Sequence, residues 1–401
     1  DSARTFVAAR LRAIPGIRHV MDACSVVTSF GWLVIGAAIA GFVGAILAGW
    51  AEAFSLFVAC LSLLIIAIIL VAAPSPYRVF LRLAQERVVA GQTALGEIRV
   101  VNDTARRGGS EVIELPIGTG VAEFVIPGVS SHETWDEFFS VLTRRRGVIE
   151  IGPARTVRSD GLGLLRRVRS WDNPVTLYVH PRTVRIPFEA TGFQVDVEGV
   201  VTAKLSSSDV SFHALRDYEP GDDRRAVHWQ STARLGKLIV RQYEETHRSH
   251  HLIVLDTSRS SWDRDSFEDG VSVAASLALA GISASRTVSF AAGKTWVPAA
   301  NAGAMLDALS SLPMSGRADI TALARRAYAA RPSASYVSIV APPSVSDAEA
   351  AHLAQVTPRD VTVQVLRINP KQRPRRRRLE GGVLYDCPSL RDLAHLVGDI
   401  R

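Results

Sequence analysis

Two long runs without charged residues dominate the hydropathy pattern near the start of the chain. No charge occurs in Ser25–Ala51 or in Ala53–Tyr77, and Glu52 alone separates the two runs. Each run reaches the roughly 20 residues that a helix needs to cross the bilayer core. The alternative is a buried helical hairpin, but soluble domains rarely need two such stretches in succession. The pattern therefore predicts a transmembrane hairpin over residues 25–77, with spans at about 26–49 and 53–73.

Small residues recur at four-residue spacing within the first span. They are Gly36, Ala40, Gly44 and Ala48. Such spacing lets the backbones of two helices approach closely. The partner of this stripe is either the second span of the same hairpin or, by self-association, the first span of another copy.

Arginines on both sides of the hairpin predict its orientation. Four precede the first span and three follow the second: Arg4, Arg10, Arg12, Arg18, Arg78, Arg82 and Arg87. Because cytoplasmic flanks carry an excess of Lys and Arg, we expect both termini and the soluble body in the cytoplasm. Residues 1–24 are then a cytoplasmic N-terminal segment, and residues 49–52 form a tight external turn. This organisation is typical of a multi-pass protein of the bacterial inner membrane.

Beyond the hairpin the pattern changes to a period of two residues. After an amphipathic connector over 79–87, apolar and polar residues alternate in short segments separated by glycine and proline, which predicts strands. These strands are expected at 92–102, 112–115, 123–126, 134–142, 147–151 and 176–179. Such a series of short strands is typical of a β-sandwich, which we place at residues 88–185.

The last part of the chain alternates buried strands with helices. Strands are expected at 251–256, 287–291, 336–341 and 361–368, and helices at 267–284, 302–312, 320–330, 347–355 and from Ser389. Ser346 and Glu349 form a capping box at the start of one of these helices. The alternation predicts an α/β domain with a doubly wound parallel sheet over residues 250–401.

Positive charge is the main feature of the composition. The net charge is +7, and lysine occurs only four times, so arginine supplies most of it. An anionic membrane surface explains this charge as well as a nucleic acid does. The run Lys371–Arg378 contains no aromatic residue on which a base could stack. We expect it to be a solvated loop and expect no specific nucleic acid partner; contact with anionic lipid or nucleic acid is the alternative.

Carboxylate and hydroxyl side chains alternate directly after the first strand of the α/β domain. Asp256, Ser258 and Ser260 form a D-x-S-x-S pattern, and a loop at the carboxyl end of a parallel strand is where doubly wound folds bind ligands. Oxygen ligands suit a hard cation such as Mg²⁺. In the alternative interpretation, these side chains hold only the backbone of the next turn.

This pattern resembles the metal-ion-dependent adhesion motif of von Willebrand factor A domains. The resemblance implies two further ligands, a Thr from a later loop and an Asp after a further strand. Here Ala318 stands where the Thr is expected, with Asp319 or Thr321 as the alternative ligands, and the strand over 336–341 runs into Pro342-Pro343 without an Asp. We therefore expect a degenerate Mg²⁺ site in the D-x-S-x-S loop.

Other candidate chemistry is weaker. His247, His250 and His251 lie close together in sequence, but adjacent residues of a strand face opposite sides, so we expect strand-edge histidines and not a metal site. The sequence contains no G-x-x-x-x-G-K-[ST], H-E-x-x-H or G-x-S-x-G motif, which removes support for an ATPase, a zinc protease or an α/β-hydrolase.

Many charged residues surround a tryptophan in the segment 215–244. Asp222 is expected to cap a short helix that contains Trp229, and Gly236 to end that helix before a strand. Because so many charges lie near one Trp, we expect a buried ion-pair junction within residues 186–249, between the β-sandwich and the α/β domain. Each charge of such a junction must be paired.

The same segment carries the most specific motif of the chain. It resembles the hallmark Y-x-x-G-D-x-x-R-x-x-x-W-x-x-x-A-R of the bacterial family known as domain of unknown function 58. The matching residues are Tyr218, Gly221, Asp222, Arg225, Trp229, Ala233 and Arg234. Upstream, the segments 145–153 and 159–164 resemble R-R-G-x-Y-x-x-G-P and D-P-x-G-L of that family, with departures at Val148-Ile149 and Gly161-Leu162.

This resemblance implies two membrane helices, a β-sandwich and a von Willebrand A-like domain. It also implies association with a MoxR-type AAA+ ATPase, often beside a transglutaminase-like membrane protein, and no established catalytic activity. We therefore expect a non-enzymatic, membrane-anchored cytoplasmic adaptor or scaffold for that ATPase in envelope protein assembly or maturation. The alternative is a metal-dependent hydrolase at the membrane surface, which would need a complete metal shell and a general base in one cleft.

Overall fold

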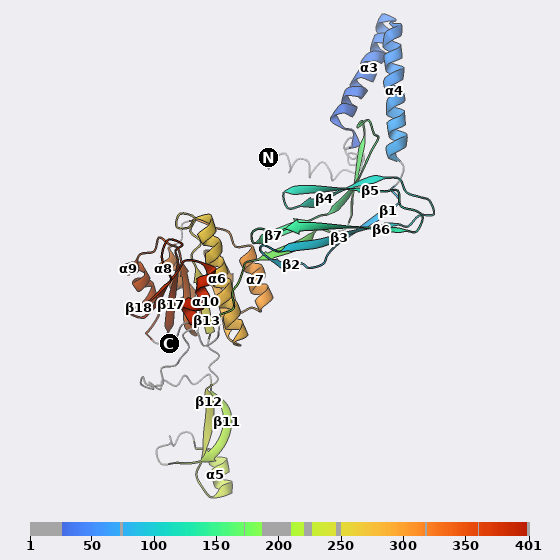
Figure 1. Cartoon of the computed structure of the whole chain (residues 1–401). Helices are drawn as coiled ribbons and strands as arrows, with labels where there is room; N and C mark the ends of the chain where they lie inside the picture. Colours follow the sequence, from blue (N-terminus) through green and yellow to red (C-terminus); the bar gives the residue numbers. More distant parts are fainter. Residues whose placement is uncertain are drawn as a thin grey trace. The chain divides into compact units, whose positions relative to one another are not determined.

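The computed structural model contains two compact units, residues 1–180 and residues 181–401. The described residues are 26–72, 75–171, 173–186, 210–219, 227–245, 250–316, 319–359 and 361–398. Figure 1 shows the elements of both units, coloured along the sequence.

Two apolar helices begin the first unit. They are α3 (Ser29–Ala48) and α4 (Ala51–Ala72), joined at Gly49, whose φ of 65° ends α3 in a left-handed conformation. Both helices are long and apolar enough to cross a membrane, which confirms the two predicted apolar helices; the orientation stays a prediction. Within the small-residue stripe a Cβ at Gly44 would meet the Cβ of Ala53 at 3.4 Å, whereas one at Gly36 would meet nothing within 4 Å. The stripe thus faces α4 in part.

Two β-sheets follow and share one apolar core. The first has the order β1-β3-β6, and the second has the order β2-β10-β7-β4-β8-β9, with β5 paired to β4. Buried residues of both sheets, such as Ile98 of the first and Leu115 of the second, belong to the same cluster. The bounds are β1 (Tyr77–Leu83), β2 (Arg87–Val89), β3 (Thr93–Asn102), β4 (Glu111–Ile117), β5 (Gly120–Ile126), β6 (Thr134–Leu142), β7 (Gly147–Ile151), β8 (Ala154–Ser159), β9 (Arg166–Trp171) and β10 (Val175–His180).

One expectation about this region is wrong. The predicted connector over 79–87 is largely strand β1, in which Tyr77, Val79 and Leu81 are buried and alternate with exposed residues. The alternation of apolar and polar residues there is the period-two pattern of a strand. The whole of β1 pairs with β3 in antiparallel register, and this pairing decides the conformation.

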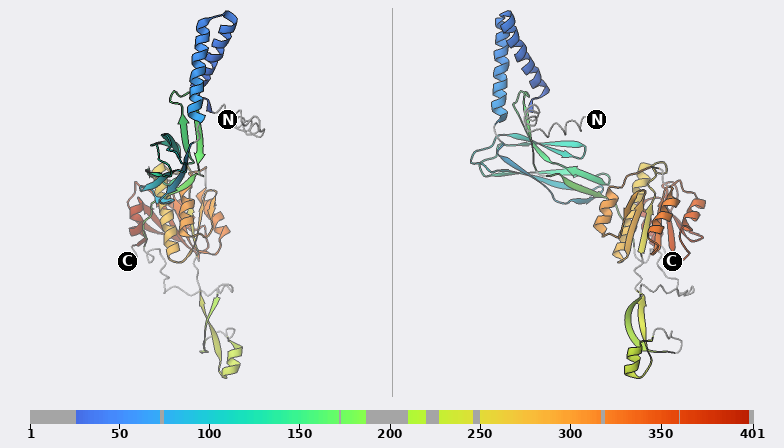
Figure 2. Two further views of the ribbon diagram at one scale, coloured as in Figure 1. Left: turned by 90° about the vertical axis from the view of Figure 1, so that its right-hand side faces the viewer. Right: turned by 180° about the vertical axis from the view of Figure 1, so that it is seen from behind.

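The turn between β8 and β9 contacts the C-terminal end of α4 and the N-terminal end of α3. Leu164 and Leu165 are buried in one cluster with Ala67 and Val71 of α4, and the Leu164 carbonyl accepts a hydrogen bond of 3.0 Å from the backbone N–H of Thr28, the residue that caps α3. Within the turn, the buried Asp160 carboxylate accepts a hydrogen bond from the Leu165 N–H at 3.0 Å. Figure 2 shows the green β8–β9 hairpin reaching the helix pair in two further views. The segment 159–164, singled out in the sequence, therefore connects the sheet to the two apolar helices.

A parallel sheet forms the core of the second unit. Its order is β15-β14-β13-β16-β17-β19-β18, in which β15 and β18 are antiparallel edge strands. The strands are β13 (His250–Leu255), β14 (Thr287–Ala292), β15 (Thr295–Val297), β16 (Ala334–Ala341), β17 (Thr362–Ile368), β18 (Arg375–Leu379) and β19 (Gly382–Cys387). Counted along the chain, the parallel strands have the order 2-1-3-4-5, a doubly wound arrangement.

Helices cover both faces of this sheet, as the prediction of a doubly wound domain requires. One apolar cluster joins the sheet to α6, α7 and α10, and the other joins it to α8 and α9. The helices are α6 (Arg264–Ser283), α7 (Ala302–Ser310), α8 (Ile320–Ala330), α9 (Asp347–Ala354) and α10 (Leu390–Gly398). The predicted capping box of Ser346 and Glu349 is present at the start of α9. A relation to von Willebrand A domains stays a prediction.

The expectation of a solvated loop at Lys371–Arg378 is wrong in its second half. Residues Arg375–Leu379 form β18, which pairs with β19. The sequence gives no strand signal here, because four consecutive arginines contain no alternation of apolar and polar residues. Among them Arg377 pairs with carboxylates of α9 and β19, as described below, and this pairing helps to hold the strand in place.

Substitution of Gly31 tests the contact between the turn and the helices. A Cβ at Gly31 would lie 2.3 Å from the Leu164 carbonyl oxygen, so Gly31→Val should displace the turn at a cost of about 1–3 kcal/mol. We expect trypsin to cleave the full chain in mild detergent after Arg166 and Arg167 at least about tenfold faster, because cleavage follows the population of the open form. Gly36→Val is the matched control, and equal cleavage of both variants would contradict the contact.

Candidate functional site

The carboxyl edge of the parallel sheet carries the predicted Asp256 loop. This loop follows β13, the first strand of the sheet, whose two neighbours are β14 and β16. The chain passes from β13 to β14 on one side and later to β16 on the other, so the loop lies at a topological switch point, where doubly wound folds bind ligands. Asp256, Thr257 and Ser258 are all buried there.

Short hydrogen bonds define the shape of the loop. The Asp256 carboxylate accepts a hydrogen bond from the Ser258 backbone N–H at 2.9 Å, and the hydroxyls of Ser258 and Ser260 lie 3.0 Å apart. The Thr257 carbonyl accepts a hydrogen bond from the Ser315 N–H at 2.9 Å. The structure therefore brings the three predicted residues together and joins them to the loop that precedes α8.

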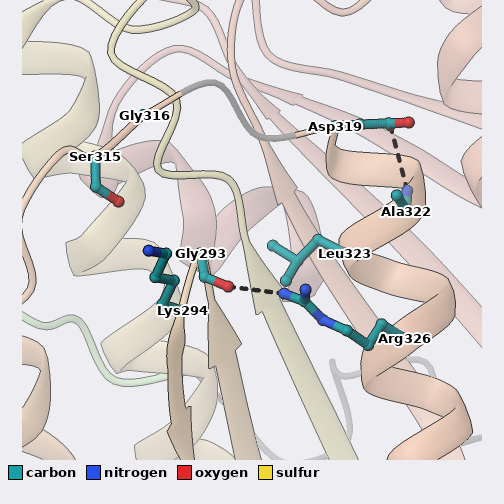
Figure 3. Close-up of a pocket in the computed structure, with 8 residues that line it drawn as sticks. All are labelled: Gly293, Lys294, Ser315, Gly316, Asp319, Ala322, Leu323 and Arg326. Atoms are coloured by element: carbon teal, nitrogen blue, oxygen red, sulfur yellow. Dashed lines mark hydrogen bonds between the residues drawn. The ribbon is translucent and has the colours of Figure 1, made fainter.

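A cavity of about 440 Å³ opens beside this loop (Figure 3). Lys294 lines it from the turn after β14, while Asp319 and Arg326 line it from α8. The Arg326 guanidinium donates a hydrogen bond of 2.9 Å to the Gly293 carbonyl, and the Asp319 carboxylate caps α8 through the N–H groups of Thr321 and Ala322. The cavity thus presents two cationic groups and one anionic group near a buried carboxylate.

Sequence reasoning missed Lys294 and Arg326. Lys294 follows the second strand at the same edge as Asp256, so its place after a predicted parallel strand was a usable signal. Arg326 is one of two adjacent arginines inside a predicted helix, and only the packing of α8 decides which of them reaches the edge.

Burial raises the pKa of Asp256 above its ordinary value, and the nearby Asp319 carboxylate adds to this effect, while hydrogen bonds from the N–H groups of Ser258 and Thr257 oppose it. The Asp256 side chain is only 2% exposed. A buried carboxylate near a second one favours uptake of a positive charge. The loop is therefore suited to hold a proton or a cation.

The donor atoms of the loop fit a hard cation in kind but are few. Asp256 offers one carboxylate and Ser258 and Ser260 offer two hydroxyls, all oxygen atoms, whereas such cations take six or more oxygen ligands. Within the described residues no group of three His, Cys, Asp or Glu side chains forms a metal site. Bound water or a partner would have to supply the rest of a Mg²⁺ shell.

Asp256→Asn separates the cost of the buried charge from its structural role. The amide oxygen can still accept the Ser258 N–H bond, so we expect the variant to gain about 1 kcal/mol in unfolding free energy in EDTA, the usual scale of one substitution. Chemical denaturation of the full chain in detergent measures this. Ser260→Ala, which leaves the charge in place, is the control and should show no gain. A loss of stability in Asp256→Asn would show that the ionised carboxylate itself stabilises the loop.

The histidines His250 and His251 begin β13 and are buried, so the expectation of strand-edge histidines is wrong. His250 pairs with the Ser289 hydroxyl of β14 at 2.9 Å, and His251 pairs with the Ser338 hydroxyl of β16 at 2.6 Å. The two side chains thus contact different neighbouring strands. His247 lies outside the described residues.

Burial lowers the pKa of His251 to about 3, with smaller contributions from Arg286 and His250. Since its ordinary pKa is 6.5, the unfolded chain binds a proton between pH 6.5 and 3 that the folded chain does not. We therefore expect the unfolding free energy to fall as the pH drops from 6.5 towards 3. His251→Asn should reduce this slope, whereas the exposed His132→Asn should not; equal slopes in all three proteins would contradict a neutral, buried His251.

The family-motif segment is described only in part. Strand β11 (Val210–Asp217) pairs with β12 (Ile239–Glu245), and helix α5 (Trp229–Leu235) lies between them in sequence. Gly236 ends α5, as predicted, but the residue that caps its start is His228. The prediction that Asp222 caps this helix is therefore wrong.

The motif residues do not form a buried cluster in the described part of the segment. Trp229 is 67% exposed, and Ala233 and Arg234 are exposed as well. The Tyr218 N–H donates to the Leu238 carbonyl at 3.0 Å. The prediction of a Trp buried among paired charges is thus not met here. The remaining motif residues, Gly221, Asp222 and Arg225, lie outside the described residues.

Comparison with known proteins defines the class of this region. Residues 214–340 match a family model described as "Protein of unknown function DUF58". The match runs from β11 to β16 and includes the Asp256 loop and all residues of the cavity beside it. This match agrees with the resemblance to the DUF58 family that the motif around Trp229 indicates.

One relative and two solved structures are similar to parts of this chain. The uncharacterized protein YeaD of Bacillus subtilis is 30% identical over 138 residues, which are 33% of this chain and 32% of YeaD; the chain thus spans about a third of this relative. The CARDB domain of a Pyrococcus furiosus protein is 14% identical over 26% of this chain and 84% of that one, with a TM-score of 0.20. A β-glucosidase from Listeria innocua is 13% identical over 26% of this chain and 16% of that one, with a TM-score of 0.18.

Proposed function

We propose that the protein is a membrane-anchored adaptor whose sheet edge binds a MoxR-type AAA+ ATPase. The observation that carries the proposal is the carboxyl edge of the parallel sheet, where the Asp256 loop adjoins a cavity lined by Lys294, Asp319 and Arg326. Charges of both signs at a topological switch point suit a specific polar partner. The type of partner comes from the DUF58 resemblance, which also suggests a transglutaminase-like membrane protein nearby.

The two apolar helices would place the bound ATPase at the membrane. A motor held by a domain that is tied to the bilayer works at a high effective concentration on membrane-bound clients. The adaptor would thereby couple the ATPase to the assembly or maturation of envelope proteins. A Mg²⁺ ion in the Asp256 loop, with ligand positions left for a partner carboxylate, would strengthen the same contact.

Charge reversal at the edge tests the proposal. We expect Lys294→Glu/Arg326→Glu to reduce recovery of the AAA+ ATPase at least about tenfold in affinity purification from mild detergent with quantitative mass spectrometry, since a lost polar contact of 1.4 kcal/mol already costs tenfold. The matched control is Arg325→Glu/Arg359→Glu, which makes the same charge change at exposed positions outside the cavity.

The outcomes separate the partner from the surface. Recovery with the natural protein and the control but not with the edge variant supports both. Equal recovery with all three proteins removes the edge as the docking surface. Absence of any AAA+ ATPase from the natural sample contradicts the adaptor proposal.

A further inference from the structure

A second charged cavity lies at the same end of the sheet but beyond β16, next to β17 and β19. Its volume is about 440 Å³, and its lining includes four arginines and two aspartates: Asp347, Arg367, Arg373, Arg375, Arg377 and Asp386. The lining therefore carries an excess of two positive charges. Neither the family match, which ends at residue 340, nor the proposed docking edge involves these residues.

The two aspartates are already paired inside the cavity. Arg367, whose side chain is only 6% exposed, donates from Nε to Asp386 at 2.7 Å and from Nη1 to Asp347 at 2.9 Å. Arg377 donates from Nη2 to Asp386 at 3.1 Å and also pairs with Asp347. These bonds hold the pKa of Asp347 well below its usual range, with the Arg377 contact as the first cause. Within the lining, Arg367, Arg377, Asp347 and Asp386 thus form one ion-pair network.

The other two arginines have no such partners. Arg373 and Arg375 are exposed, and among the described residues neither side chain forms an ion pair or a side-chain hydrogen bond. The buried Nε of Arg377 also lacks an acceptor in the described part of the chain. Unused guanidinium donors thus adjoin a rigid network that neutralises both carboxylates and leaves the excess charge unopposed.

We propose that this cavity binds the phosphate group of a small anionic ligand, with Arg373 and Arg375 as its principal contacts. A guanidinium presents paired N–H donors in a planar fork that matches two phosphate oxygens. Arg367 and Arg377 fix the shape of the cavity and add positive potential. This binding is independent of the proposed adaptor role.

Strand β18 and the segment before it offer a matched pair of variants. Arg373→Gln/Arg375→Gln removes the two unpaired cations that line the cavity, one before β18 and one at its start. Arg376→Gln/Arg378→Gln removes two cations of β18, also two residues apart, that do not line the cavity. Both variants change the net charge of the protein equally, and neither touches the buried Arg367–Asp386 pair.

Isothermal titration of the full chain in neutral detergent with inorganic pyrophosphate tests the proposal. We expect saturable binding by the natural protein, a change of less than about twofold in Arg376→Gln/Arg378→Gln, and at least tenfold weaker binding in Arg373→Gln/Arg375→Gln, because hydrogen bonds to charged groups are the strong ones. No saturable binding by the natural protein, or an equal loss in both variants, overturns the proposal.

A second experiment distinguishes a lipid headgroup from a free phosphate compound as the ligand. The natural protein is placed in nanodiscs of phosphatidylcholine alone or with added phosphatidic acid, and the pyrophosphate titration is repeated. Weaker pyrophosphate binding in the phosphatidic acid discs, restored to the level of the plain discs when the protein is titrated in detergent, identifies the headgroup as the source. Equal binding in both discs identifies a free phosphate compound.

Discussion

Enclosure of β13 is the constraint on which the second unit depends. All six residues of this strand are buried, β14 and β16 occupy its two edges, and helices cover both faces of the sheet. A backbone so enclosed must have every N–H and C=O group paired, which the two parallel neighbours provide. The chain leaves β13 at its carboxyl end. The connection to β14 runs to one side of β13, and the later connection to β16 runs to the other side. The Asp256 loop is therefore placed by topology before any of its own side-chain contacts are made.

Because β13 is enclosed, polar side chains inside the sheet must find hydrogen-bond partners on neighbouring strands. His250, His251, Ser289 and Ser338 bond to one another across strands, and Gln364 donates to Ser338 at 2.5 Å. These groups are neutral, which avoids the large cost of a buried charge. Charged pairs occur instead towards the end of the sheet, where Arg367 and Asp386 meet with side chains 6% and 3% exposed.

The sequence predicted the elements that their own residues determine. The bounds of the strand at Thr134–Leu142 and of the helix at Ile320–Ala330 agree with the structure, because alternation in the one and amphipathic spacing with an Asp cap in the other are local signals. Two other strands carry no such signal. In β9 five of the six residues are exposed, and in β18 the ion pairs of Arg377 are made with Asp347 of α9 and Asp386 of β19, which are carboxylates of other elements.

The residues of the candidate site also fall into those that local sequence predicts and those that it does not. The Asp256 loop was predictable because a buried strand and a D-x-S-x-S pattern are adjacent in the chain. Lys294 could have been found from its place after the second parallel strand, whereas Arg326 could not, because only the packing of α8 decides which of two adjacent arginines reaches this edge. The cap of α5 shows a further limit, since both Asp222 and His228 precede Trp229 and only the observed bond from the Ser231 N–H to the His228 ring selects one.

The turn at Leu164 gives the first unit a mechanical property. The sheet is tied to α4 by the covalent chain and also by Leu164 and Leu165, which are buried in one cluster with Ala67 and Val71. The Leu164 carbonyl also accepts a hydrogen bond from the N–H of Thr28 before α3. A shift of the β8–β9 turn relative to the helices would therefore break contacts at α4 and at the cap of α3 together. The turn couples the sheet to both helices at once.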